Sequence, residues 1–144
     1  MANWVSIHFL LFFFVLGFIS WQDIRLRIIS HKSLLLLLII ILSLAVTQQA
    51  LPNFTAALSI LLVGYFLFFF NVIGGGDVKL MAVLSLGLSD SSLAFFLFFT
   101  AFFGGVIAIA CLIIFNDSIR RFGIPYGVAI SSAFLFTLLF NMSM

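Results

Sequence analysis

Long apolar stretches, separated by short polar segments, dominate the sequence. Residues 33–76 contain no Asp, Glu, Lys, Arg or His. A helix that crosses a membrane needs about 20 mostly apolar residues, so this run can hold two crossings. Pro52 and Asn53, within the polar turn at residues 48–53, can end one helix and start the next. Three further stretches are apolar enough to cross: residues 3–21, 92–116 and 123–141.

A sixth apolar segment, residues 78–89, is short. As a helix it spans only about 18 Å at 1.5 Å per residue, so it either dips into a cavity or thins the membrane locally. The pattern therefore predicts an all-α, polytopic membrane protein with about six transmembrane helices, the fourth of them short. No linker or internal repeat divides residues 1–144, and we expect a single integral-membrane domain.

Composition excludes the other common classes of protein. Hydrophobic residues make up 65% of the 144 residues, and charged residues only 7%, whereas soluble domains are about 25% charged. The one cysteine, Cys111, cannot form an internal disulfide or a paired-cysteine zinc site. A net charge of +2 with no basic stripe gives no sign of nucleic-acid binding. We expect no metal and no cofactor.

Lysine and arginine predict the orientation in the membrane. With six crossings, three loops fall on one side, and they carry all the basic residues: Arg25, Arg27, Lys32, Lys79, Arg120 and Arg121. Basic loops face the cytoplasm, so both termini are expected outside. If residues 78–89 did not cross, Arg120 and Arg121 would move outside. We expect the basic loop residues to fix topology and to contact anionic lipid, and we assign the arginines no role in binding a substrate.

Two aspartates share one side of the membrane. Asp23 lies at the cytoplasmic end of the first span and Asp77 opens the fourth, and two crossings separate them. Ionisable residues at membrane depth indicate functional sites. Asp23 has an alternative role as a helix cap or as a partner of Arg25 or Arg27. Asp117, which could pair with Arg120 or Arg121, is the main rival for the second acid on this side.

Three glycines, Gly74, Gly75 and Gly76, directly precede Asp77. Glycine permits positive φ and close backbone approach, so we expect a turn against which a peptide substrate could lie. The alternative is a glycine loop with Asp77 as an ordinary helix cap. Two converging carboxylates could share one proton, so that one activates water and the other polarises a peptide carbonyl.

The motifs around both aspartates resemble those of a known family. Residues 74–82, GGGDVKLMA, look like the GxGDxKLxA signature of the prepilin peptidases, which are membrane aspartic proteases. Asp23 and the following Ile-Ser-His at 29–31 resemble the family's first motif, with His31 where Asn is usual. Residues 125–130, PYGVAI, are similar to the motif that opens the last span, and their Pro-Tyr-Gly argues against presenilin-like proteases. The matches occur in family order.

This resemblance implies a reaction and a substrate. Asp23 and Asp77 would be the catalytic pair that removes the leader of a type IV prepilin or pilin-like protein, at the cytoplasmic face of the bacterial inner membrane. Larger members carry a domain with paired CxxC motifs, associated with methylation of the mature pilin. With one cysteine and a first cytoplasmic loop of residues 22–32 only, this chain resembles the short form that serves Flp/Tad-type pili.

Two other classes of function remain as alternatives. A small proton-coupled carrier could use Asp23 and Asp77 as ion-binding groups, although a carrier site is expected near the midplane. A structural subunit of a membrane complex would not need paired acids. Lys79 could contact either an acidic group of the substrate or the lipid headgroups.

Overall fold

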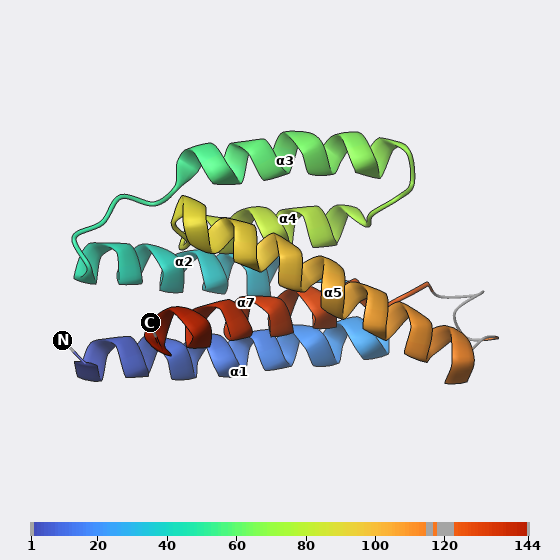
Figure 1. Ribbon diagram of the computed structural model, residues 1–144, viewed down its shortest axis with the longest axis horizontal. Coiled ribbons are helices and arrows are strands. Elements are labelled where there is room, and N and C mark those ends of the chain that lie inside the picture. Colours follow the sequence, from blue (N-terminus) through green and yellow to red (C-terminus); the bar gives the residue numbers. More distant parts are fainter. Residues whose placement is uncertain (1, 115–116, 118–122, 144) are drawn as a thin grey trace.

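The computed structural model describes residues 2–114, 117 and 123–143. In this part of the chain the regular structure is entirely helical (Figure 1), with the elements α1 (Ala2–Leu26), α2 (His31–Thr47), α3 (Phe54–Phe69), α4 (Gly75–Ser85), α5 (Asp90–Ile114) and α7 (Tyr126–Ser143). Each expected apolar segment overlaps one of these helices. With 11 residues α4 is the shortest of them, so the predicted fold class, including the short fourth helix, is confirmed.

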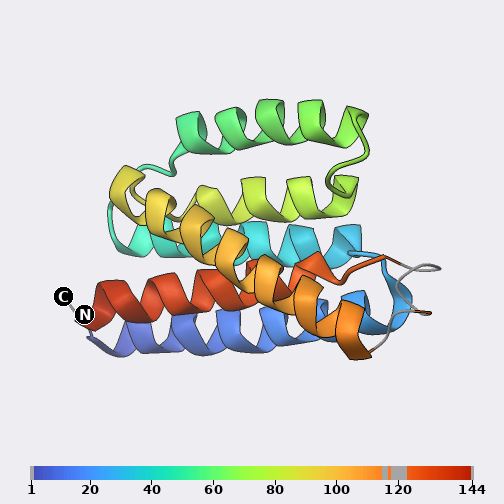
Figure 2. The ribbon, with the colours of Figure 1, turned by 45° about the vertical axis from the view of Figure 1, so that its right-hand side comes forward.

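Four of the helices form a closed ring around the core. α1 packs on α2 and on α7, and α4 closes the ring by packing on the same two helices. α3 lies outside the ring against α4, and α5 crosses α7 obliquely (Figures 1 and 2). Each ring helix contributes fully buried apolar side chains, such as Leu16, Leu37, Leu80 and Ile130. The short α4 therefore lies at the centre of the molecule and not at its surface.

The outer surface is apolar, as a lipid environment requires. Within the described residues, three helices are long and apolar enough to cross a membrane: Asn3–Leu26, Asp90–Ile114 and Tyr126–Ser143. Of an 18-residue apolar stretch within α5, only 6% is buried inside the protein. Because a helix that is hydrophobic on every side is stable only in an apolar surrounding, the exposed face of α5 lies in hydrocarbon. The chain is a membrane protein.

The connections gather at two opposite ends of the bundle. The N- and C-termini lie together at one end, where α2 is joined to α3 and α4 to α5 (Figures 1 and 2). The other end holds the α1–α2 and α3–α4 connections and the start of α7, and we call it the aspartate end. This alternation is the one that six crossings predict.

The end of α1 differs from the sequence expectation. The apolar segment stops at Trp21, but the helix continues to Leu26. Hydropathy marks only where the chain leaves hydrocarbon, whereas backbone hydrogen bonds continue to the N–H of Arg27, which donates to the Asp23 carbonyl oxygen at 3.1 Å. Asp23 thus lies within a helix and not in a solvated loop.

Candidate active site

Asp23 and Asp77 line the same cavity at the aspartate end. This aspartate cavity, of about 580 Å³, is walled by the end of α1, the α1–α2 and α3–α4 connections, and the starts of α4 and α7. The charges of the two carboxyl groups act on each other. Two carboxylates that interact in one cavity titrate as a pair and can hold a single proton between them.

The last helix fixes the position of Asp23. Its side chain is 6% exposed, and its Oδ2 accepts a hydrogen bond of 2.8 Å from the backbone N–H of Gly127. Gly127 is the second residue of α7, where backbone N–H groups have no partner within the helix. A Cβ atom at Gly127 would lie 2.8 Å from Oδ2 and 3.0 Å from Cγ of Asp23. Only glycine allows α7 to approach the carboxylate this closely.

Asp77 is held by the first turn of its own helix. It is the third residue of α4, and its carboxylate lies against Gly74, the residue before the helix, so that a Cβ at Gly74 would lie 3.0 Å from Oδ2 of Asp77. This is the arrangement in which an acid in the first turn reaches back to the helix start. The next residue, Val78, packs so closely on α3 that a Cβ at Gly64 would lie 2.5 Å from its Cγ1. The packing of α4 on α3 therefore sets the depth of Asp77.

The glycines before Asp77 act differently from the expectation. Gly74 has φ −71°, and Gly75 and Gly76 are already helical, so none of the three uses positive φ. The helix begins at Gly75, before the acid, and the Asp77 carboxylate lies back against Gly74. The glycines instead permit close packing: a Cβ at Gly74 would lie 3.0 Å from the Asp77 carboxylate, and one at Gly76 would lie 3.4 Å from Ile29.

Three basic side chains also line the aspartate cavity, namely Arg27, His31 and Lys79. The sequence predicts a substrate or lipid contact for Lys79, but only a role in topology and lipid contact for Arg27. Asp117, the rival second acid, is exposed and is not among the cavity-lining residues that the structure describes. Its suggested pairing with Arg120 or Arg121 lies outside the described residues.

A second cavity adjoins the first and opens along α5. This side cavity, of about 370 Å³, shares Val72, Ile73, Asp77 and Tyr126 with the aspartate cavity. Small residues of α5 form its outer wall: Thr100, Ala101, Gly104, Gly105 and Ala108. Asp77 therefore lies at the junction between a polar chamber and an apolar one that follows a lipid-facing helix.

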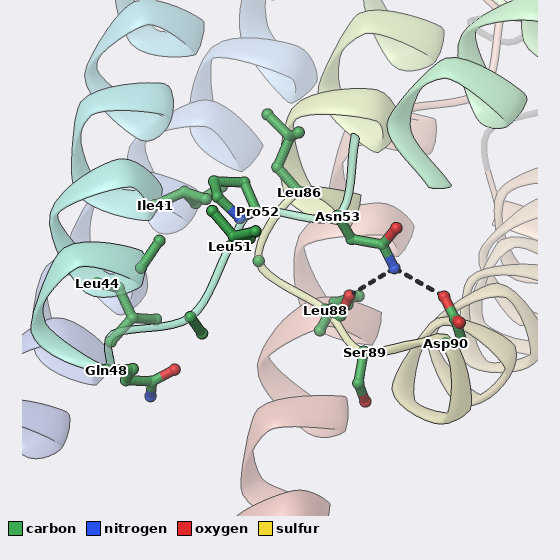
Figure 3. A pocket seen from close by; sticks show the side chains of 13 residues that line it. Ile41, Leu44, Gln48, Leu51, Pro52, Asn53, Leu86, Leu88, Ser89 and Asp90 are labelled. Atoms are coloured by element: carbon green, nitrogen blue, oxygen red, sulfur yellow. Dashed lines mark hydrogen bonds between the residues drawn. The ribbon is translucent and has the colours of Figure 1, made fainter. Parts of the chain in front are cut away.

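The opposite end of the bundle has a cavity of about 500 Å³, but its chemistry is different (Figure 3). Asp90 is the only acid among its described lining residues. One oxygen of the Asp90 carboxylate accepts a hydrogen bond of 2.8 Å from the Asn53 side-chain amide, which also donates to the Leu88 carbonyl oxygen at 3.1 Å. These bonds join the start of α3 to the start of α5, so the role of Asn53 and Asp90 is structural.

Comparison with known proteins adds one finding. The model of the type IV leader peptidase family matches residues 10–109, which include both aspartates of the cavity but not α7. No curated protein and no solved structure matches the chain.

Proposed function

The chain belongs to the type IV leader peptidase family, and from this premise we propose that it is an aspartic endopeptidase with Asp23 and Asp77 as its catalytic pair. The observation that carries the proposal is that the two carboxyl groups, which are 54 positions apart in the sequence, line one cavity at the aspartate end. Family membership implies a protease with a leader-bearing protein substrate. The pair supplies the chemistry such a protease needs.

In the proposed reaction the pair enters with one carboxyl ionised and the other protonated. The ionised group takes a proton from water as the water oxygen attacks the peptide carbonyl carbon, and the protonated group donates to the carbonyl oxygen. As the tetrahedral intermediate collapses, the carboxyl that took the water proton gives it to the leaving nitrogen, the C–N bond breaks, and the other carboxylate takes a proton from a hydroxyl of the intermediate. The pair thus returns to one ionised and one protonated group. Because the proton belongs to the pair, neither aspartate is assigned a fixed role.

We propose a prepilin of the Flp/Tad type as the substrate, cleaved at the cytoplasmic face of a bacterial inner membrane. In this arrangement the leader lies in the aspartate cavity and the apolar segment that follows it lies in the side cavity along α5. Two observations support this: Asp77 borders both cavities, and small residues on a membrane helix favour close contact with another helix. A carrier is less well supported, because both acids lie at one end of the bundle and not near its middle.

Cleavage by purified enzyme tests the catalytic pair. We expect Asp23→Asn and Asp77→Asn each to abolish leader removal, measured by the gel shift of a pilin precursor, while both variants remain in the membrane at near-normal abundance. Asparagine is nearly isosteric with aspartate, but it cannot act as a base or hold the shared proton. Since the pair acts as a unit, the double variant should be little worse than either single variant.

Asp117→Asn is the matched control and should cleave normally, since Asp117 is exposed and outside the cavity. The capping alternative for Asp77 makes the opposite prediction, because asparagine is as good a cap as aspartate. Efficient cleavage by either cavity variant would remove that residue from the mechanism.

A further inference from the structure

Arg27 occupies an unfavourable backbone position at the edge of the aspartate cavity. It follows the last residue of α1 with φ +54°, in the left-handed region that a side chain disfavours. Helices commonly end with a residue in this conformation, and it is usually glycine. Arginine therefore stands where the backbone alone would favour glycine.

The guanidinium group of Arg27 lacks a hydrogen-bond partner for one nitrogen. Nη1 is buried and makes no hydrogen bond within the part of the chain that the structure describes. Buried donors without a partner are rare in proteins, because each loses its hydrogen bonds to water without replacement. Arg27 is half-buried and lines the cavity that contains both aspartates, and its long side chain allows the guanidinium to turn toward that space.

Arg25, two residues earlier, provides a contrast. Its side chain is exposed, and its guanidinium lies over the Trp21 ring, 5.5 Å from the ring centroid. It is absent from the described lining of the cavity. Arg25 thus has the surroundings expected of an arginine that anchors a membrane helix at the interface, whereas Arg27 does not.

We propose that Arg27 is a substrate-binding residue whose guanidinium donates a hydrogen bond to a backbone carbonyl oxygen of the peptide held in the aspartate cavity. The bound peptide supplies the acceptor that the free enzyme lacks. A carbonyl oxygen fits better than a carboxylate, because the charge of Arg27 already acts on Asp23. The inference rests on the proposed peptidase function and adds a residue that holds the substrate against the catalytic pair.

The variant Arg27→Gly distinguishes a role of the Arg27 side chain from a role of its backbone conformation. Glycine accepts the left-handed conformation, so the thermal stability of the purified variant should be no lower than that of the wild type. Leader cleavage should nevertheless fall about tenfold or more in kcat/KM. Binding of the pilin precursor to the inactive Asp77→Asn enzyme should weaken by a similar factor when Arg27→Gly is added, as expected for the loss of one charged hydrogen bond. Arg25→Gln should leave all three quantities unchanged.

Three outcomes would overturn the proposal. The first is wild-type kcat/KM in Arg27→Gly. The second is a loss of cleavage with unchanged precursor binding, which would show that Arg27 acts only through Asp23. The third is that Arg27→Gly loses thermal stability, whereas Arg27→Lys keeps the stability, precursor binding and cleavage of the wild type. That result would show a structural role for Arg27. Failure of the wild-type enzyme to cleave any precursor would instead reject the proposed function.

Discussion

At the scale of single residues, the site depends on contacts that leave no room for a side chain. Gly127 brings its N–H to Asp23, and the same closeness excludes even a methyl group at that position. The aspartate carboxylate is thus positioned by an atom of the backbone, which cannot change rotamer. A buried carboxylate that accepts such a bond is held more rigidly than one bound by another side chain.

Gly127→Ala should therefore damage catalysis more than folding. The new methyl group would lie 2.8 Å from Oδ2 of Asp23, so the carboxylate must move, and a misplacement of about 1 Å can cost roughly 100-fold in rate. We expect kcat/KM for leader cleavage to fall by about that factor while the variant still reaches the membrane. Gly17→Ala is the control, because a Cβ there has nothing within 4 Å. Equal activities of the two variants would contradict this account of Asp23.

The sequence could predict the two acids but not what holds them. Asp23 and Asp77 stand out because charges are rare in this chain, and counting crossings places them on one side. The bond between Gly127 and Asp23 joins residues 104 positions apart, and no local pattern indicates such a pair. Arg27 was missed for a related reason: in sequence it is one of several basic loop residues, and only its backbone angle and its unpartnered nitrogen distinguish it.

At the scale of elements, apolar content predicted where helices form but not how they end. All six helices that the structure describes coincide with apolar segments, because a membrane span must satisfy its own backbone hydrogen bonds. Helix ends depend instead on individual contacts, such as that of the Asp77 carboxylate with Gly74. Apolar content therefore does not reveal that Gly75 and Gly76, expected in a flexible turn, already belong to the first turn of α4.

The exposed face of α5 provides a test of the side cavity. A Cβ at Gly105 meets nothing within 4 Å, so Gly105→Leu adds bulk to the cavity wall at little packing cost. We expect it to lower cleavage of a full precursor about tenfold, since displacing even part of a helix contact loses one or more kcal/mol. A short leader peptide without the apolar segment should be cleaved as by the wild type.

Gly17→Leu matches this change on α1, where a Cβ also has open space but lies outside the side cavity. It should not affect either substrate. A uniform loss with both substrates in Gly105→Leu would show that the apolar segment binds elsewhere.

At the scale of the whole molecule, the bundle has two chemically different ends. The aspartate end contains the two carboxyl groups and the basic side chains of the cavity, whereas the opposite end contains both termini and the structural bonds of Asn53. The proposed orientation places the aspartate end in the cytoplasm.

Labelling of introduced cysteines tests this orientation. In a Cys111→Ser background, Leu51→Cys lies in the α2–α3 connection, where the leucine is 93% exposed, and Leu26→Cys lies at the aspartate end, where the leucine is 62% exposed. A membrane-impermeant thiol reagent should label the first in intact cells and the second only after lysis. The reverse pattern would place the aspartate end outside and contradict cleavage in the cytoplasm.

The bond between Gly127 and Asp23 also orders events during synthesis. Asp23 emerges from the ribosome early, yet the N–H that positions it belongs to the final helix. A partly translated chain can insert both acids into the bilayer while Asp23 still lacks this support, so the two acids are fully positioned only after α7 has been made.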